Sequence, residues 1–241
     1  MQTSVQNNLI RIPSAKVFEN ALNDKPVTAL RNIVEKFPFL FDHCYLAGGV
    51  CEYVSNAERQ RRFFDVDLFF SSEEEMECIK SRLNGHLHFL RTGAFSLYYV
   101  LYFDRAHALS FDSSKFNLAT AKVSECVLLN FVTFKYFDSL SNLLNSFDLS
   151  CCQVAFDGQD FIYYDTALTD IYLRTGALSS FVKRELDDCE SQVNWRSVLS
   201  RIGKYKNRGY RFFKNEVELV ERKVSEQTND TSIIGYLSAF I

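Results

Sequence analysis

The spacing of apolar residues changes along the chain, and it predicts which segments are helices and which are strands. Between Pro26 and Val34, apolar residues recur every three or four positions, as on one face of a helix, and Pro38 is expected to end that helix. Short apolar runs rich in aromatic and β-branched residues are typical of strands. Such runs predict strands at 44–47, 65–70, 86–90, 95–103, 125–134, 148–156 and 161–164.

Further helices are predicted at 50–54, 74–83, 139–147, 167–174, 180–205 (as one or two helices) and 216–226. Beyond residue 165 the pattern is almost entirely helical, and no Pro-rich or Gly/Ser-rich linker marks the change. We therefore expect an α+β protein. Residues 1–165 would form a core with a mixed sheet flanked by helices, and residues 166–241 a C-terminal helical extension packed on that core.

One pair of neighbouring segments carries candidate chemistry. The apolar run at 44–47 leads into Gly48 and Gly49, and the next predicted strand begins with Asp65 and Asp67. Because side chains alternate faces along a strand, the two carboxylates point to the same side and repel each other, and a divalent metal is the usual reason for such a pair. The glycines would let the backbone approach a phosphate closely. Taken singly, each half has a simpler interpretation, as an ordinary turn and as a solvated strand face.

Composition narrows the class of protein. The 241 residues are 47% hydrophobic and 15% aromatic, which excludes a disordered chain and allows a sizeable core. The net charge of -3 argues against a dominant nucleic-acid-binding field, but it allows a local basic patch. The seven cysteines are scattered without a C-x-x-C pair, so we expect buried free thiols in a reducing cytosol and no zinc site.

The chain carries no sequence signal for a membrane. Its N-terminal segment lacks the charged region followed by an apolar region that marks a signal peptide. No apolar run reaches the length of about eighteen residues that a membrane span needs. We therefore expect a cytoplasmic protein with no membrane partner.

Gly48 and Gly49, followed by the D-x-D of Asp65 and Asp67, resemble the nucleotidyltransferase superfamily, which has the DNA polymerase beta-like fold. There, a G-G or G-S motif opens a helix and a D-x-D on the next strand binds metal. The resemblance covers roughly residues 30–157. It implies a nucleoside triphosphate substrate held at the glycines and Mg²⁺, or Mn²⁺, held at the carboxylates. A Rossmann-like sheet is the alternative, but the chain lacks G-x-G-x-x-G and regular βαβ alternation.

The same superfamily places a third carboxylate on a neighbouring strand, and Asp148 occurs in the expected order along the chain. The resemblance then implies that Asp65, Asp67 and Asp148 are catalytic and share the metals, with Asp148 as a base or an orienting group. The S-F-D unit ending at Asp148, before a Cys-containing segment, also resembles nucleotidyltransferase-like proteins of large DNA viruses and phages, so the protein would act in the host cytoplasm. The simpler interpretation is that Asp148 only caps or ends an element.

Two basic segments are candidates for contacts with the substrate. Arg62, the last of several arginines in the connector 56–62, could reach triphosphate oxygens, although a solvated loop also explains it. In the tail, cations alternate with tyrosines in an R-x-x-K-Y-x-x-R-G segment that related viral proteins share. Lys204, Tyr205 and Arg208 suit phosphate binding and base stacking, and a solvated helix end with cations near its C-terminus explains them equally well.

The resemblance implies nucleotidyl transfer with two-metal catalysis: an NMP group moves from a nucleoside triphosphate to an acceptor hydroxyl, and pyrophosphate is released. The acceptor would be an RNA end, a protein hydroxyl or a small molecule. Related CCA-adding enzymes and poly(A) polymerases follow the glycines with V-R-D, whereas here Val50 precedes Cys51 and Glu52, so addition to tRNA ends is not expected. This departure leaves a second hypothesis, a catalytically inactive protein of the same fold that serves as a viral binding or structural module.

Overall fold

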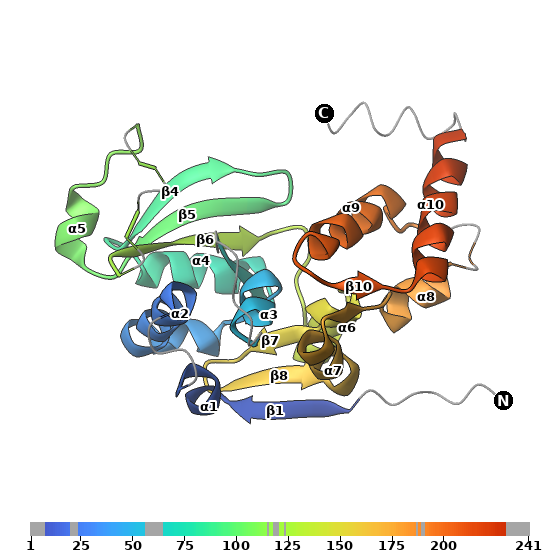
Figure 1. Ribbon diagram of the computed structural model, residues 1–241. Coiled ribbons are helices and arrows are strands. Elements are labelled where there is room, and N and C mark those ends of the chain that lie inside the picture. Colours follow the sequence, from blue (N-terminus) through green and yellow to red (C-terminus); the bar gives the residue numbers. More distant parts are fainter. Residues whose placement is uncertain are drawn as a thin grey trace.

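A large mixed sheet forms the centre of the protein, as the computed structural model shows (Figure 1). The structure describes residues 8–19, 24–55, 65–114, 116–117, 121–122, 124–186, 188 and 191–229. Eight strands form the sheet in the order β1-β8-β7-β2-β3-β6-β5-β4. Their bounds are β1 Leu9–Pro13, β2 Cys44–Ala47, β3 Val66–Phe70, β4 Leu87–Thr92, β5 Ser96–Tyr102, β6 Cys126–Val132, β7 Val154–Phe156 and β8 Asp160–Tyr164.

Strand directions bring the two candidate motifs together. Neighbouring strands run antiparallel, except that β3 and β6 are parallel. Because β2 and β3 are antiparallel neighbours, the end of β2 lies beside the start of β3, and Ala47 pairs with Asp67. The predicted α+β class with a mixed sheet is confirmed.

Helices flank the sheet and make up most of the chain after β8. The α-helices are α1 Ser14–Glu19, α2 Lys25–Lys36, α3 Gly49–Ser55, α4 Glu73–Arg82, α5 Arg105–Leu109, α6 Leu140–Asn145, α7 Asp165–Leu173, α8 Ser180–Glu185, α9 Trp195–Lys206 and α10 Lys214–Asn229. Two short 3₁₀ helices are η1 Pro38–Asp42 and η2 Ser150–Cys152, and a separate parallel pair is formed by β9 Thr175–Gly176 and β10 Arg211–Phe212. No helix in these described segments is long and apolar enough to cross a membrane.

The two faces of the sheet bury different side chains. On one face, residues of α2, α3 and α4 pack with Leu68 and Phe70 of β3 in the main hydrophobic core. On the other face, residues of α6 and α7 pack with Phe69 and Ala155. The alternation predicted for β3 is therefore present, and Asp67 shares the face of Phe69.

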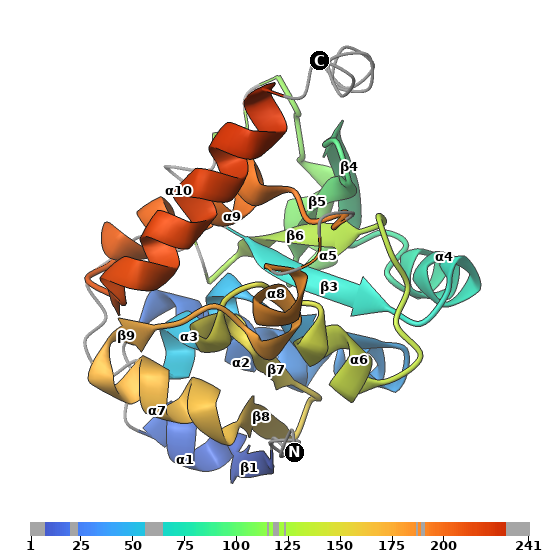
Figure 2. The ribbon, with the colours of Figure 1, turned by 90° about the vertical axis from the view of Figure 1, so that its right-hand side faces the viewer.

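The C-terminal helices pack on the core. Trp195, Ile202 and Tyr205 of α9 and Val220 of α10 belong to the same hydrophobic cluster as residues of α2 and α3. Helix α10 runs alongside α9, and both lie beyond the ends of the central strands (Figure 2). The position of a domain boundary at residue 165 stays a prediction.

The segment 148–156 is not the continuous strand that the sequence predicts. Only its end is extended, as β7, and η2 precedes it. The hydroxyl of Ser150 donates to the carboxylate of Asp170, which holds this turn against α7 and away from the strand ladder. Cys151 and Cys152 are both buried in η2 as free thiols.

Candidate functional site

The glycine turn faces the D-x-D pair. Strand β2 ends at Ala47, and α3 begins at Gly49. Between them Gly48 has φ +79°, a left-handed backbone conformation that residues other than glycine rarely adopt. A Cβ atom placed on Gly48 would lie 3.1 Å from Asp67 Oδ2. Gly48 is therefore required both for the turn and for the close approach of the carboxylate.

The two carboxylates lie where the sequence predicts them. Asp65 comes directly before β3 and Asp67 lies within it, while Val66 and Leu68 are buried in the main core on the opposite face. Both aspartate side chains are partly exposed. They therefore form one acidic surface beside the glycine turn.

The electrostatics of this pair favour a bound cation. The pKa of Asp67 is raised to about 7, first because burial disfavours the charged carboxylate and next because Asp65 repels it. Lys204 and Arg208 act in the opposite direction on Asp67. Burial also raises the pKa of Asp65, against the lowering effect of Lys204, Arg208 and Arg91. A cation bound between the two carboxylates would relieve their repulsion.

Asn130 is a member of the site that the sequence analysis missed. It pairs with Asp67 across the parallel strands β3 and β6, and its Nδ2 donates a 2.7 Å hydrogen bond to Asp67 Oδ1. Its own Oδ1 is buried and has no hydrogen-bond partner among the described residues. The signal in the sequence was one amide in the otherwise apolar, fully buried run of β6.

The end of α9 and the turn that follows it place two cations, Lys204 and Arg208, beside the carboxylates and the glycine turn. Lys204 and Arg208 both act on the carboxylates, and Arg208 Nη1 would lie 3.9 Å from a Cβ atom on Gly49. Burial, followed by repulsion from Arg208, lowers the pKa of Lys204. The structure thus brings Gly48, Gly49, Asp65, Asp67, Lys204 and Arg208 together from three separate parts of the sequence.

A buried carboxylate holds Arg208 in place. Glu52 of α3 is fully buried, its Oε2 lies 3.6 Å from Arg208 Nη1, and its Oε1 accepts a 2.6 Å hydrogen bond from the hydroxyl of Tyr210. The guanidinium of Arg208 also lies over the ring of Tyr205, 4.6 Å from its centroid. Tyr205 itself is buried and packs edge to face on Tyr210. The buried ring of Tyr205 therefore packs against the guanidinium of Arg208 and helps to fix its position.

Asp148 is not part of this group. It lies in the bend between α6 and η2, almost fully buried, and forms an ion pair with Arg201 of α9. Within the described ranges, no three or more His, Cys, Asp or Glu side chains are grouped so that they could hold a metal ion. The expected convergence of three carboxylates is therefore absent there, and the charge of Asp148 is balanced by Arg201 instead. Arg62, the other predicted phosphate ligand, lies outside the described residues.

The oxygen atoms that are present fit a divalent cation. Asp65 and Asp67 supply carboxylates on one face, and the buried Oδ1 of Asn130 is an acceptor without a partner in the part of the chain that the structure describes. Mg²⁺ and Mn²⁺ prefer such oxygen ligands and retain several waters, so two carboxylates can suffice on the protein side.

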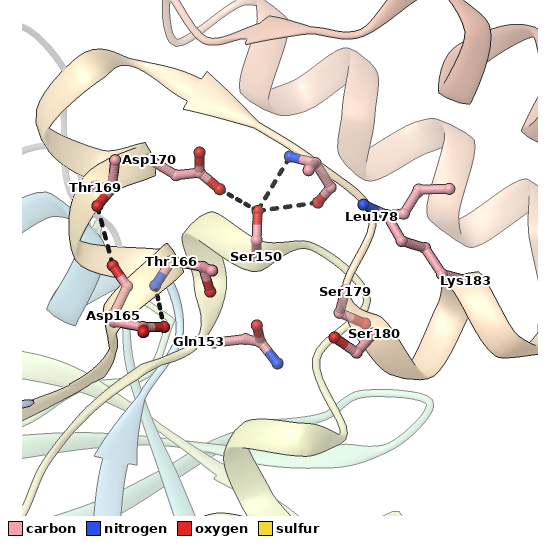
Figure 3. A pocket seen from close by; sticks show the side chains of 11 residues that line it. Ser150, Gln153, Asp165, Thr166, Thr169, Asp170, Leu178, Ser179, Ser180 and Lys183 are labelled. Carbon is pink, nitrogen blue, oxygen red and sulfur yellow. Dashed lines mark hydrogen bonds between the residues drawn. The ribbon is translucent and has the colours of Figure 1, made fainter. Parts of the chain in front are cut away.

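A cavity of ≈ 410 Å³ lies elsewhere, between η2, α7 and α8, and Figure 3 shows it from close by. Several of its polar side chains already have partners: Asp170 accepts from the hydroxyls of Ser150 and Thr175, and Lys183 pairs with Glu216. Neither the glycine turn nor the D-x-D pair lines this cavity. Its hydrogen bonds stabilise the junction of η2 with the C-terminal helices.

Several solved structures have a fold similar to that of this chain. A CCA-adding enzyme in complex with CTP is 14% identical with a TM-score of 0.56, and the match covers 90% of this chain and 47% of that chain. A CCA-adding enzyme in complex with ATP is 15% identical with a TM-score of 0.55, covering 90% and 46%. The Thermotoga maritima CCA-adding enzyme complexed with tRNA is 15% identical with a TM-score of 0.53, also covering 90% and 46%. This chain therefore has a nucleotidyltransferase fold and spans about half the length of these relatives.

Sequence comparison then identifies the family. Residues 15–174 match the family described as Gabija anti-defense 2 family protein, and the chain belongs to that family. The matched range contains the glycine turn, the D-x-D pair and Asn130, and it ends before α9. No curated protein of similar sequence was found.

Proposed function

We propose that this protein is a nucleotidyltransferase that moves an NMP group from a nucleoside triphosphate to an acceptor hydroxyl and releases pyrophosphate. The observation that carries the proposal is the position of Gly48 directly against the carboxylate of Asp67. This contact joins a backbone turn suited to phosphate with a carboxylate pair suited to a metal.

The donor nucleotide would be bound from two sides. The backbone at Gly48 and Gly49 leaves room for phosphate oxygens, and Arg208 reaches the same turn. Lys204 adds a second positive charge near the carboxylates. A triphosphate carries several negative charges, so two cations held at a glycine turn match its chemistry. Arg62 remains a further candidate ligand for the same phosphates.

Asp65, Asp67 and the Oδ1 of Asn130 would hold Mg²⁺ or Mn²⁺. When bound, the metal would make the acceptor hydroxyl more acidic and neutralise charge on the phosphates. In the reaction, the acceptor oxygen forms a bond to the α-phosphorus while the bond from that phosphorus to the bridging oxygen breaks. Pyrophosphate leaves with the bonding electron pair, and the hydroxyl proton passes to solvent. Lys204 and Arg208 would stabilise the charge that gathers on the leaving group.

The family description names an action against a defense system, Gabija. We propose that nucleotidyl transfer is the chemistry through which this protein acts, as a viral or phage product in the host cytoplasm. The solved relatives were captured with CTP, ATP and tRNA. Nucleoside triphosphates are accordingly the proposed donors, and the acceptor is an RNA, a protein or a small molecule.

A second candidate function is a binding module without turnover. It is favoured by the ion pair that engages Asp148, since the expected third carboxylate is then unavailable for a second metal. In that case Lys204 and Arg208 would simply balance the charge of the D-x-D pair. Nucleotide binding without magnesium dependence would distinguish this function.

Calorimetric titration tests the proposal. ATP, GTP, CTP and UTP are titrated into the wild type and into Asp65→Ala/Asp67→Ala, with and without magnesium. The expected result is magnesium-dependent binding of at least one nucleotide, lost in the double variant. If no nucleotide binds to the folded wild type under any condition, the proposal is wrong.

A further inference from the structure

A row of side chains crosses the sheet from the carboxylates to its outer edge. Asp67 pairs with Asn130, and Asn130 pairs with Tyr98 of β5. Tyr98 in turn pairs with Arg91 of the edge strand β4. Directly paired residues of neighbouring strands point to the same face, so the row lies on the face of Asp67. With strands about 4.8 Å apart, Tyr98 lies roughly 10 Å from Asp67.

Tyr98 and Arg91 form a stacked pair at the end of this row. The guanidinium of Arg91 lies over the ring of Tyr98, 4.7 Å from its centroid. Arg91 is exposed and Tyr98 is half-buried. The backbone of Gly93 closes on the ring, because a Cβ atom there would lie 2.9 Å from Tyr98 Cε2. The ring is thus held in one position before any ligand arrives.

The direction of the reaction points to this pair. Gly48, Gly49 and Arg208 lie on the β2 side of Asp67, where the proposed function places the triphosphate. In an in-line displacement, the attacking oxygen enters opposite the leaving pyrophosphate. The acceptor should therefore approach from the other side, over Asn130 and Tyr98. Arg91, exposed on the edge strand and stacked on Tyr98, supplies positive charge on that side.

We infer that Tyr98 and Arg91 bind the terminal nucleotide of a single-stranded nucleic-acid acceptor, with the base stacked on the pair. This inference rests on the proposed nucleotidyl transfer and names its acceptor class. An aromatic ring beside a guanidinium matches the chemistry of a base and its phosphate. The 3′ oxygen of that nucleotide forms the new bond to the α-phosphorus, pyrophosphate leaves with the electron pair, and the hydroxyl proton passes to solvent.

Two further aromatic rings are exposed at one end of the neighbouring strands β5 and β6. Phe95 and Phe134 are exposed just beyond the ends of β5 and β6, and their rings contact edge to face with centroids 6.2 Å apart. Successive aromatic rings near a cation are typical of surfaces that bind single strands without sequence preference.

Fluorescence anisotropy tests the inference. Two 5′-labelled oligonucleotides of about ten nucleotides with free 3′ hydroxyls, one RNA and one DNA, are bound to the full chain with magnesium and a non-hydrolysable nucleoside triphosphate. We expect Tyr98→Leu and Arg91→Met each to weaken oligonucleotide binding about 5- to 100-fold. Tyr98→Phe keeps the ring and should stay within about twofold of the wild type. Which oligonucleotide binds more tightly identifies the source of the acceptor.

Two control variants match these changes. Phe89→Leu alters an exposed ring of the same edge strand that contacts Tyr99, a residue of the core on the opposite face. Arg82→Met alters an exposed arginine whose guanidinium lies 4.0 Å from the ring centroid of Phe39. Neither should change oligonucleotide binding by more than about twofold.

The outcomes separate this inference from the proposed function. If nucleoside triphosphate binds but neither oligonucleotide does, or if Arg91→Met and Tyr98→Leu bind as tightly as the wild type, the acceptor inference is wrong and nucleotidyl transfer stands. If the triphosphate itself does not bind, both fall. Melting temperatures and triphosphate affinities of the variants show whether a loss of oligonucleotide binding is local. Arg91 is exposed, so Arg91→Met keeps the test valid if Tyr98→Leu unfolds.

Discussion

Tyr210 and Glu52 lie 158 positions apart in the chain, and the hydroxyl of Tyr210 donates a 2.6 Å hydrogen bond to Glu52 Oε1 in the protein interior. Arg208, two residues earlier, lies 3.6 Å from the other oxygen of the same carboxylate. Helix α3, which starts at the glycine turn, is thereby tied to the segment that follows α9. The positive charge beside the turn depends on this buried contact.

Removal of the buried carboxylate should destabilise the fold. In Glu52→Ala, Tyr210 loses its acceptor and Arg208 loses its opposite charge, and breaking one side of a buried pair costs about 3 kcal/mol. Urea denaturation measures the loss. Glu218→Ala, which removes an exposed carboxylate of α10 that pairs with Lys214, should change the free energy of unfolding by less than about 0.5 kcal/mol. Equal stabilities of the two variants would contradict this role for Glu52.

The raised pKa of Asp67 predicts a pH dependence of stability in metal-free protein. The folded state binds the proton of Asp67 more tightly than the unfolded state, since the pKa rises from 3.8 to about 7. The stabilisation that this bound proton gives the folded state is complete below the pKa of Asp67 in the unfolded state, and it is lost as the pH rises through 7. Asp67→Asn removes this dependence.

At pH 8 with chelator, we expect Asp67→Asn to melt about 2–4 °C above the wild type, which corresponds to about 1 kcal/mol. Magnesium should then stabilise the wild type and leave the variant unchanged. Asp65→Asn should show part of the effect, because Asp65 raises the pKa of Asp67 by repulsion. Identical pH profiles of wild type and Asp67→Asn would show that this carboxylate is not strained by burial.

Asp148→Asn should separate structure from catalysis. The ion pair with Arg201 predicts a loss of about 1–3 kcal/mol in the free energy of unfolding, because Arg201 keeps its charge without a full partner. Magnesium-dependent nucleotide binding should stay within about threefold of the wild type, which is less than 1 kcal/mol. A loss of magnesium dependence as large as in Asp65→Ala/Asp67→Ala would return Asp148 to the metal site.

Arg208→Met should weaken the binding of a nucleoside triphosphate more than that of a monophosphate. Arg208 lies at the glycine turn, where the pyrophosphate portion is expected, so the triphosphate should lose about tenfold or more in affinity and the monophosphate less than about twofold. Calorimetry with ATP and AMP measures both. Arg222→Met, which changes an exposed arginine of α10, is the matched control. Equal losses for ATP and AMP would place Arg208 away from the β- and γ-phosphates.

Local patterns in the sequence predicted the glycine turn, the D-x-D strand and most elements near them. Gly48 and Asp67 could be predicted from local sequence alone. Gly48 is a residue that allows a tight backbone turn, and Asp67 follows the alternation of side chains along a strand. The class of fold followed from their order along the chain. Strand β3 begins one residue later than predicted, at Val66, which leaves Asp65 just outside it.

The remaining site residues depend on long-range packing. Asn130 joins Asp67 only because β6 runs parallel to β3, and no local pattern states which strands are neighbours. The order of Asp148 after the glycines and the D-x-D pair, in a family that carries a third carboxylate on a neighbouring strand, predicts Asp148 at the metals. Order along the chain does not show that η2 follows Asp148 or that Arg201 reaches it from α9. Tyr205 was chosen for base stacking, but helix periodicity alone did not show that its ring is buried.

Transfer of a labelled phosphate tests the central claim most directly. The protein is incubated with magnesium, an extract that supplies acceptors, and nucleoside triphosphate labelled on either the α- or the γ-phosphate. The account predicts that α-label enters an acceptor while γ-label is released as pyrophosphate, in the wild type and not in Asp65→Asn/Asp67→Asn. Absence of α-label from RNA, protein and small molecules alike, with triphosphate bound by the wild type, would contradict nucleotidyl transfer and leave a binding module.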